Sequence, residues 1–111
     1  MAASWGRITA REIAGAAKGA LLEGSADTAI SGVNTDTRSL EPGELFWALV
    51  GERFDGHEFM DAALEQGAVG VVGKPARVRS LLLPRGCVAI GVEDPLKALG
   101  DLASWWRRGH G

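Results

Sequence analysis

Short apolar runs alternate with amphipathic stretches along the chain, and this alternation predicts a small α/β domain. The apolar runs indicate β-strands over residues 20–23, 29–34, 44–50, 68–72 and 87–92. Apolar positions three and four residues apart indicate helices over residues 8–18, over residues 55–66 and from residue 94 onward. Strands that are apolar almost throughout belong to sheets covered on both faces. We therefore expect a small mixed β-sheet with flanking helices.

The first turns of the first two expected helices have recognisable signals. Thr9 and Glu12 have the spacing of a capping box before the first helix. Asp55 is placed to cap the second helix, with Phe54 and Phe59 at the two positions of a hydrophobic staple. One face of that helix is expected to consist of Phe59, Ala62, Ala63 and Gln66, with Met60 and Leu64 beside it.

The C-terminal half contains a third helix start and a basic segment. Asp94 followed by Pro95 opens the last helix, whose expected apolar stripe is Leu96, Leu99, Ala103 and Trp106. Residues 109–111 are expected to fray. Residues 73–86 contain prolines and read as mostly loop, with a solvated face formed by Arg77, Arg79 and Arg85. Trp47 lies in the middle of a strand and is expected in the core.

Composition narrows the class of protein. The chain has 111 residues, of which 46% are hydrophobic, and a formal net charge of −2. These values are typical of one folded domain and argue against a basic nucleic-acid-binding surface. Neither a membrane-spanning run nor a secretory signal is visible, so a cytoplasmic location is expected. Cys87 is the single cysteine, and its apolar surroundings predict a small buried side chain.

Several common catalytic and cofactor motifs are absent from the sequence. It contains neither the ATP phosphate loop Gly-x-x-x-x-Gly-Lys-Ser/Thr nor the dinucleotide fingerprint Gly-x-Gly-x-x-Gly. No group of cysteines and histidines has the spacing of metal ligands. The residues therefore predict no catalytic side chain, no metal site and no cofactor held by this chain.

A polar segment, Thr35-Asp36-Thr37-Arg38, follows the strand expected at 29–34. Strand ends of this kind are where open α/β sheets usually bind ligands. One interpretation is a turn in which Asp36 or Thr37 bonds to its own backbone. The other is a binding surface on which Thr37 donates to a ligand and Arg38 faces a phosphate or holds the loop. The residues alone favour neither interpretation.

The second candidate segment is the loop Gly51-Glu52-Arg53-Phe54-Asp55-Gly56-His57. A structural interpretation has Asp55 merely capping the helix that follows. Glu52 and Arg53 cap nothing, which favours a role in ligand binding. The backbone N–H groups at the start of a helix are able to receive a phosphate or a carbonyl oxygen. His57, in the first helical turn, is expected on the surface.

These segments together resemble the N-terminal domain of the Mur ligases. The similar blocks span nearly the whole chain and comprise residues 35–38, 42–49, 51–59, 63, 67–68 and 94–103. Within the family, the chain is most similar to the ligases that add D-alanyl-D-alanine to UDP-N-acetylmuramoyl-tripeptide. Residues 51–57 favour this branch over the ligases that add the third residue of the peptide, which remain the alternative.

The resemblance implies that residues 1–111 form a single N-terminal domain that binds the UDP part of the UDP-N-acetylmuramoyl-peptide substrate. In such ligases the contacts come from the Asp-Ser/Thr-Arg motif and from the loop after the next strand. Carried over to this sequence, the UDP-binding residues are Thr35, Thr37, Arg38, Gly51, Glu52, Arg53, Phe54, Asp55, Gly56 and His57. Threonine at position 37 replaces the commoner serine, which keeps the hydroxyl and adds a methyl group.

The resemblance also implies a place in a larger enzyme of peptidoglycan biosynthesis. A central domain that binds ATP and Mg²⁺, and a C-terminal domain that receives the dipeptide, are expected beyond residue 111. The whole enzyme would activate a carboxylate with ATP and join it to an amine, while this fragment would anchor the substrate without catalysis. From other classes, a stand-alone binding module or a purely structural interaction domain remain alternatives.

Overall fold

The computed structural model describes the backbone of residues 2–109 and the side chains of residues 8–109. Six strands form one sheet in the order β1-β3-β4-β5-β6-β2. Strands β3, β4, β5 and β6 are parallel to one another, and the edge strands β1 and β2 run antiparallel to their neighbours. The bounds are β1 (Ala2–Thr9), β2 (Ala20–Glu23), β3 (Ala29–Asn34), β4 (Glu44–Trp47), β5 (Gly70–Gly73) and β6 (Val88–Gly91).

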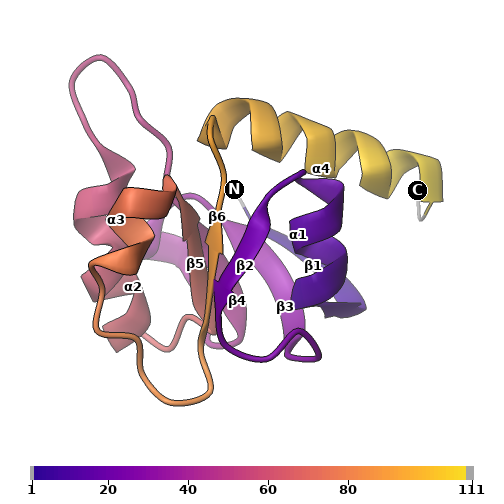
Figure 1. Cartoon of the computed structure of the whole chain (residues 1–111), viewed down its shortest axis with the longest axis horizontal. Helices are drawn as coiled ribbons and strands as arrows, with labels where there is room; N and C mark the ends of the chain where they lie inside the picture. Colours follow the sequence, from indigo (N-terminus) through magenta and orange to yellow (C-terminus); the bar gives the residue numbers. More distant parts are fainter. Residues whose placement is uncertain (1, 110–111) are drawn as a thin grey trace.

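Helices cover both faces of the sheet. They are α1 (Ala10–Ala16), α2 (Met60–Glu65), α3 (Pro75–Arg79) and α4 (Pro95–Gly109), with the 3₁₀ turns η1 (Thr37–Ser39) and η2 (Gly56–Phe59). Helices α1 and α4 lie on one face, and α2 and α3 lie on the other (Figure 1). This arrangement confirms the predicted α/β class with a small mixed sheet.

The alternation of side chains along each strand divides the core into two halves. On β4, Leu45 and Trp47 belong to the half beneath α1 and α4, whereas Phe46 belongs to the half beneath α2 and α3. The Trp47 indole Nε1–H donates to the carbonyl oxygen of Pro95 at 2.8 Å. The predicted core position of Trp47 is confirmed, and the hydrogen bond links the sheet to the start of α4.

The helix starts predicted from the sequence are present. Thr9 and Glu12 form the expected capping box, in which the Glu12 N–H donates to Thr9 Oγ1 at 3.3 Å and the Thr9 N–H donates to Glu12 Oε1 at 3.1 Å. Asp94 Oδ1 accepts from the backbone N–H groups of Leu96 and Lys97, each at 3.2 Å. Local capping chemistry therefore fixes where α1 and α4 begin.

Two elements differ from the prediction. Residues 2–9 form strand β1, paired with β3, where no strand was expected. Helix α3 occupies part of the predicted loop, with Pro75 at the first helical position, where its missing N–H costs nothing. The C-terminal residues His110 and Gly111, expected to fray, lie outside the described residues, whereas Gly109 ends α4.

The buried faces of α2 and α4 are only partly the predicted ones. In α2 the buried residues are Met60, Ala63 and Leu64, whereas Phe59 is 46% exposed. Residues 56–59 form a 3₁₀ turn with three residues per turn, which changes the face that the following helix presents to the sheet. In α4 the buried residues are Pro95, Ala98 and Leu102. Of the predicted stripe, Leu99 and Trp106 are partly buried against the same half of the core, whereas Leu96 is exposed.

Candidate functional site

A cavity of about 480 Å³ lies beside the ends of β3 and β4 and the start of η2. Because these strands are parallel neighbours, their carboxyl ends open at the same edge of the sheet. The structure thus brings the two candidate segments to one cavity. Its lining residues are Thr35, Asp36, Thr37, Arg38, Phe46, Leu49, Phe54, Gly56 and Phe59.

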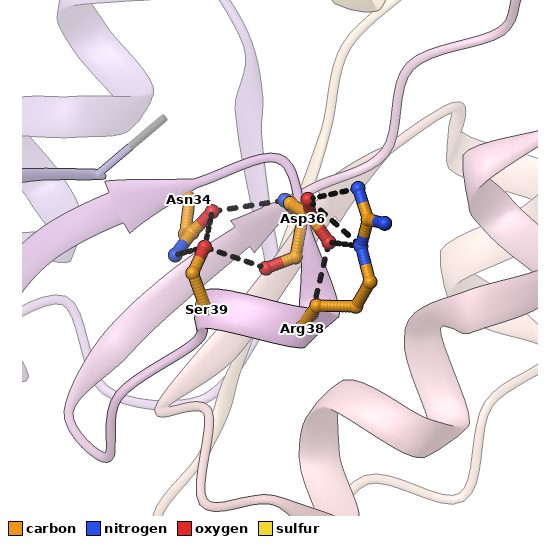
Figure 2. A network of polar contacts seen from close by, with 4 residues as sticks. All are labelled: Asn34, Asp36, Arg38 and Ser39. Atoms are coloured by element: carbon orange, nitrogen blue, oxygen red, sulfur yellow. Dashed lines mark hydrogen bonds and ion pairs between the residues drawn. The ribbon is translucent and has the colours of Figure 1, made fainter.

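The first wall of the cavity, residues 35–39, is built on the fully buried side chain of Asn34. Asn34 Oδ1 accepts from the Asp36 backbone N–H at 2.9 Å, and Nδ2 donates to Ser39 Oγ at 3.1 Å (Figure 2). Nδ2 also lies 3.2 Å from Oε1 of the buried Glu44, which accepts from the Glu41 N–H at 2.8 Å. Buried polar groups are stable only when paired in this way, so the network fixes the turn.

Asp36 and Arg38 form a pair within the first wall. Asp36 Oδ1 accepts from the Arg38 backbone N–H at 2.9 Å, and Oδ2 accepts from Arg38 Nη2 at 2.9 Å (Figure 2). These bonds, first from the guanidinium and then from the backbone, lower the pKa of Asp36 to about 2. The carboxylate in turn raises the pKa of Arg38. The structural interpretation of Asp36 as a turn cap is therefore confirmed.

The hydroxyls of Thr35 and Thr37 have no hydrogen-bond partner among the described residues. Neither Oγ1 takes part in a hydrogen bond within the part of the chain that the structure describes. Both residues are half-buried and both line the cavity. A hydroxyl is both a donor and an acceptor, so this wall offers two such groups to a ligand.

The second wall, residues 51–57, consists of most of the loop between β4 and η2 and the first residues of η2. This loop projects from the body of the domain (Figure 1). Its backbone returns toward β4 through a bridge between Val50 and Asp55 and a bond from the Gly56 N–H to the Leu49 carbonyl at 2.7 Å. A Cβ atom at Gly56 would lie 2.6 Å from that carbonyl oxygen, so only glycine permits this approach.

The aromatic residues Phe54, in the second wall, and Phe59, just after it, are exposed. Phe54 and Phe59, expected to form a hydrophobic staple, are 56% and 46% exposed and line the cavity instead of joining either half of the core. Gly51, Glu52 and Arg53 are not among the lining residues. Within residues 8–109, the side chains of Glu52 and Arg53 make no hydrogen bond or ion pair, and both are exposed.

His57 is buried, with only 4% of its surface exposed, which corrects the expectation of a surface residue. Its Nε2 accepts from the Lys74 backbone N–H at 2.9 Å, so the proton is on Nδ1, which lies 2.7 Å from Asp55 Oδ1. The ring therefore joins the second wall to the start of α3. The sequence pattern gave no sign of Lys74 as its partner.

Asp55 supports the second wall from outside the cavity. Oδ1 accepts from the His57 backbone N–H at 3.0 Å and so caps η2, while Oδ2 accepts from Arg77 Nη1 at 2.6 Å. The Arg77 guanidinium, and after it His57, hold the pKa of Asp55 far below its usual range. Arg77 was expected on a solvated loop face but lies in helix α3, where it is ion-paired with Asp55 and 43% of its side chain remains exposed.

Four residues around the cavity were missed from the sequence, namely Asn34, Ser39, Glu44 and Arg77. Asn34 and Glu44 had a detectable signal, since each is a polar residue at one end of a short apolar strand. Such a residue must find a partner once it is buried. Ser39 and Arg77 had no such signal.

Metal ligands and reactive thiols add nothing to this site. No group of three or more histidine, cysteine, aspartate or glutamate side chains among the described residues has the geometry to hold a metal ion. Cys87 is only partly buried, less than its apolar surroundings suggested, and this partial burial raises the pKa of its thiol. Within residues 2–109, no helix has the length and apolar character needed to cross a bilayer.

The domain is of the α/β class, and the parallel strands at the centre of its mixed sheet end at a polar and aromatic cavity, the place where such sheets usually bind small ligands. A family model described as "Mur ligase family, catalytic domain" matches residues 29–107. The chain belongs to the Mur ligase family. The matched region contains no ATP phosphate loop.

Two relatives of this chain are ligases that add different groups. The UDP-N-acetylmuramoyl-tripeptide--D-alanyl-D-alanine ligase of Haemophilus influenzae is 39% identical over 88 residues, which is 79% of this chain and 18% of that protein. The UDP-N-acetylmuramoyl-L-alanyl-D-glutamate--2,6-diaminopimelate ligase of Parabacteroides distasonis is 38% identical over 96 residues, which is 86% of this chain and 19% of that protein. Both are ligases, and this chain spans about a fifth of their length.

A solved structure shares the whole fold. A crystal structure of MurF from Acinetobacter baumannii superposes with a TM-score of 0.76 and 27% identity, covering 96% of this chain and 22% of that one. The six-stranded mixed sheet with helices on both faces is therefore the fold of a MurF region.

Proposed function

We propose that this chain is the substrate-recognition domain of a MurF-type ligase, and that the cavity binds the UDP part of UDP-N-acetylmuramoyl-tripeptide. The full enzyme would add D-alanyl-D-alanine to this substrate, with ATP and Mg²⁺ bound in its central domain. This domain contributes the binding energy that orients one end of a long substrate. A cytoplasmic location and a role in cell-wall biogenesis belong to the same proposal.

The observation that carries the proposal is the pairing of free hydroxyls with exposed aromatic rings in one cavity. Thr35 and Thr37 line it without hydrogen-bond partners in residues 8–109, and Phe54 and Phe59 line it while exposed. Hydroxyls suit the polar edge of uracil and the ribose, and aromatic rings suit the flat face of a base. The volume of about 480 Å³ is within the range of small-molecule sites.

Positive charge is available for the diphosphate. Arg38 donates to Asp36 through Nε and Nη2, which leaves Nη1 outside that pair. Arg53 lies in the second wall without an ion-pair partner in the described part of the chain. Guanidinium groups bind phosphate oxygens with charge-assisted hydrogen bonds, so both arginines are suited to contact a diphosphate.

Titration with UDP tests the proposal directly. Amide signals of the chain would be followed by NMR, with pyrophosphate and ADP as matched ligands that lack uracil. We expect UDP to shift the amides of Thr37, Phe54 and Arg53 and to leave those of β6 in place. Absence of these shifts, or equal shifts with pyrophosphate alone, would refute UDP recognition at the cavity.

A MurE-type ligase, which adds the third residue of the peptide, is the second candidate, because the Parabacteroides distasonis relative has that type of activity in its name. The two substrates share the UDP end and differ in the peptide. Ligation assays of the whole enzyme with the dipeptide and the tripeptide substrate decide between them. The MurF proposal expects ligation to the tripeptide substrate and weak or no ligation to the dipeptide substrate.

A further inference from the structure

We propose that Arg77 is a positioning residue for the cavity, because it holds Asp55 and thereby keeps the second wall in the place that forms the binding site. The inference deepens the proposed function and rests on it only in taking UDP as the ligand for the binding test. Arg77 itself does not line the cavity.

One carboxylate joins α3 to the second wall. Arg77 Nη1 lies 2.6 Å from Asp55 Oδ2, while Asp55 Oδ1 accepts from the His57 backbone N–H at 3.0 Å and lies 2.7 Å from the ring Nδ1. Both oxygens of the carboxylate are therefore in use, one toward α3 and one toward η2. Loss of the Arg77 bond leaves Asp55 with its bonds to His57 and its backbone bridge to Val50, but without a direct link to α3.

A second link runs beside the first. The Lys74 backbone N–H, at the start of α3, donates to His57 Nε2 at 2.9 Å. The ring packs so closely on β5 that a Cβ atom at Gly73 would lie 2.8 Å from its Nε2. The position of the ring is thus set by backbone, whereas the direct link between Asp55 and α3 depends on a single side chain, Arg77.

Asp55 occupies the point at which the second wall meets the cavity. It lies between Phe54 and Gly56, which both line the cavity. Beyond it, the loop is closed by the bridge between Val50 and Asp55 and by a bond from the Gly51 N–H to the Phe54 carbonyl at 2.9 Å. A change in the position of Asp55 is therefore transmitted to the aromatic and glycine residues of the cavity.

The test compares Arg77→Gln with Arg79→Gln, a matched control on the same helix whose side chain is exposed and makes no ion pair within residues 8–109. The ion pair is partly exposed, with 43% of the Arg77 side chain and 29% of the Asp55 side chain accessible. We expect R77Q to raise amide exchange at Gly56 and to lower UDP affinity, each about fivefold, the upper range for a partly exposed pair. Exchange at Val71 and Val72 in β5 should stay at the wild-type rate, and R79Q should change neither quantity.

Arg77→Lys keeps the charge without the planar fork and should recover part of both effects. The positioning role is overturned if Gly56 exchange in R77Q equals that of the wild type, if R79Q has the same effect, or if exchange rises while UDP affinity stays unchanged. If the wild-type chain binds no UDP, the proposed function fails, and exchange at Gly56 still decides whether Arg77 holds the wall.

Discussion

The two walls of the cavity are held in different ways. The first wall, residues 35–39, rests on Asn34 and Glu44, two buried side chains within hydrogen-bonding distance of each other. The second wall, residues 51–57, is held at its carboxyl end by Asp55 and His57, while the side chains of Glu52 and Arg53 contact no polar partner in the described part of the molecule. One wall is tied to the core of the sheet, and the other is tied at one end.

This difference corresponds to a difference in chemistry. The first wall presents the hydroxyls of Thr35 and Thr37, whose hydrogen bonds depend on precise direction. The second wall presents Phe54, an exposed ring whose apolar contacts are less directional. The wall that is tied to the core thus presents the directional contacts, and the wall that is tied at one end presents the apolar ones.

The largest effect is expected for Asn34→Ala. The change removes the acceptor for the Asp36 N–H and the donor that faces Ser39 and Glu44. Leaving such buried groups unpaired costs about 2 kcal/mol of unfolding free energy. Urea denaturation measures this, with Ser39→Ala as a control that should cost less because Ser39 is exposed. A loss as small as that of the control would show that Asn34 does not hold the first wall.

The next effect concerns ligand affinity and leaves stability unchanged. Thr37→Ala removes a hydroxyl that has no protein partner among the described residues, so the melting temperature should stay at the wild-type value. The affinity for UDP should fall by about 1–2 kcal/mol, the contribution of one hydrogen bond. Calorimetry of Thr37→Ser, which keeps the hydroxyl, should give wild-type affinity. If T37A binds UDP as tightly as the wild type, the Thr37 hydroxyl does not contact the ligand.

Much of the fold, and the meeting of the two candidate segments at one cavity, could be predicted because they depend on local signals. The capping box of Thr9 and Glu12 and the apolar strands predicted most elements correctly. The polar segments that follow two parallel strands had to meet at one edge of the sheet, and residues of both line one cavity. Local chemistry and the geometry of parallel strands suffice for this level of description.

What could not be predicted depends on contacts between distant parts of the chain. Arg77 pairs with Asp55 across 22 positions, and the Lys74 backbone binds His57 across 17 positions. Neither contact leaves a periodic trace in the sequence. Strand β1 is defined by its backbone pairing with β3, which a residue pattern does not reveal. The supports of the second wall are therefore visible only in three dimensions.

A smaller effect, which depends on pH, is expected at the pair of Asp36 and Arg38. The Asp36 pKa falls from 3.8 to about 2 in the folded chain. A lowered folded pKa stabilises the protein above the unfolded value, and the contribution is lost as pH decreases through the folded value. The wild type should therefore exceed Asp36→Asn in stability at pH 5, and the difference should shrink by pH 2. Urea titrations at several pH values measure it, and the low pKa of Asp55 is common to both proteins. A difference that stays constant with pH would contradict the pairing.

The smallest effect on stability is expected for Arg53→Ala. Its side chain is exposed and makes no hydrogen bond or ion pair within residues 8–109, so the unfolding free energy should change by less than about 0.5 kcal/mol. UDP affinity should fall about twofold at low salt, because an exposed cation near a diphosphate contributes little and is screened by salt. Glu52→Ala is the matched control and should leave affinity equal or slightly higher, since it removes a negative charge from the same loop. If R53A instead lowers the melting temperature by several degrees, the side chain is part of a structural contact, and the second wall is as firmly held as the first.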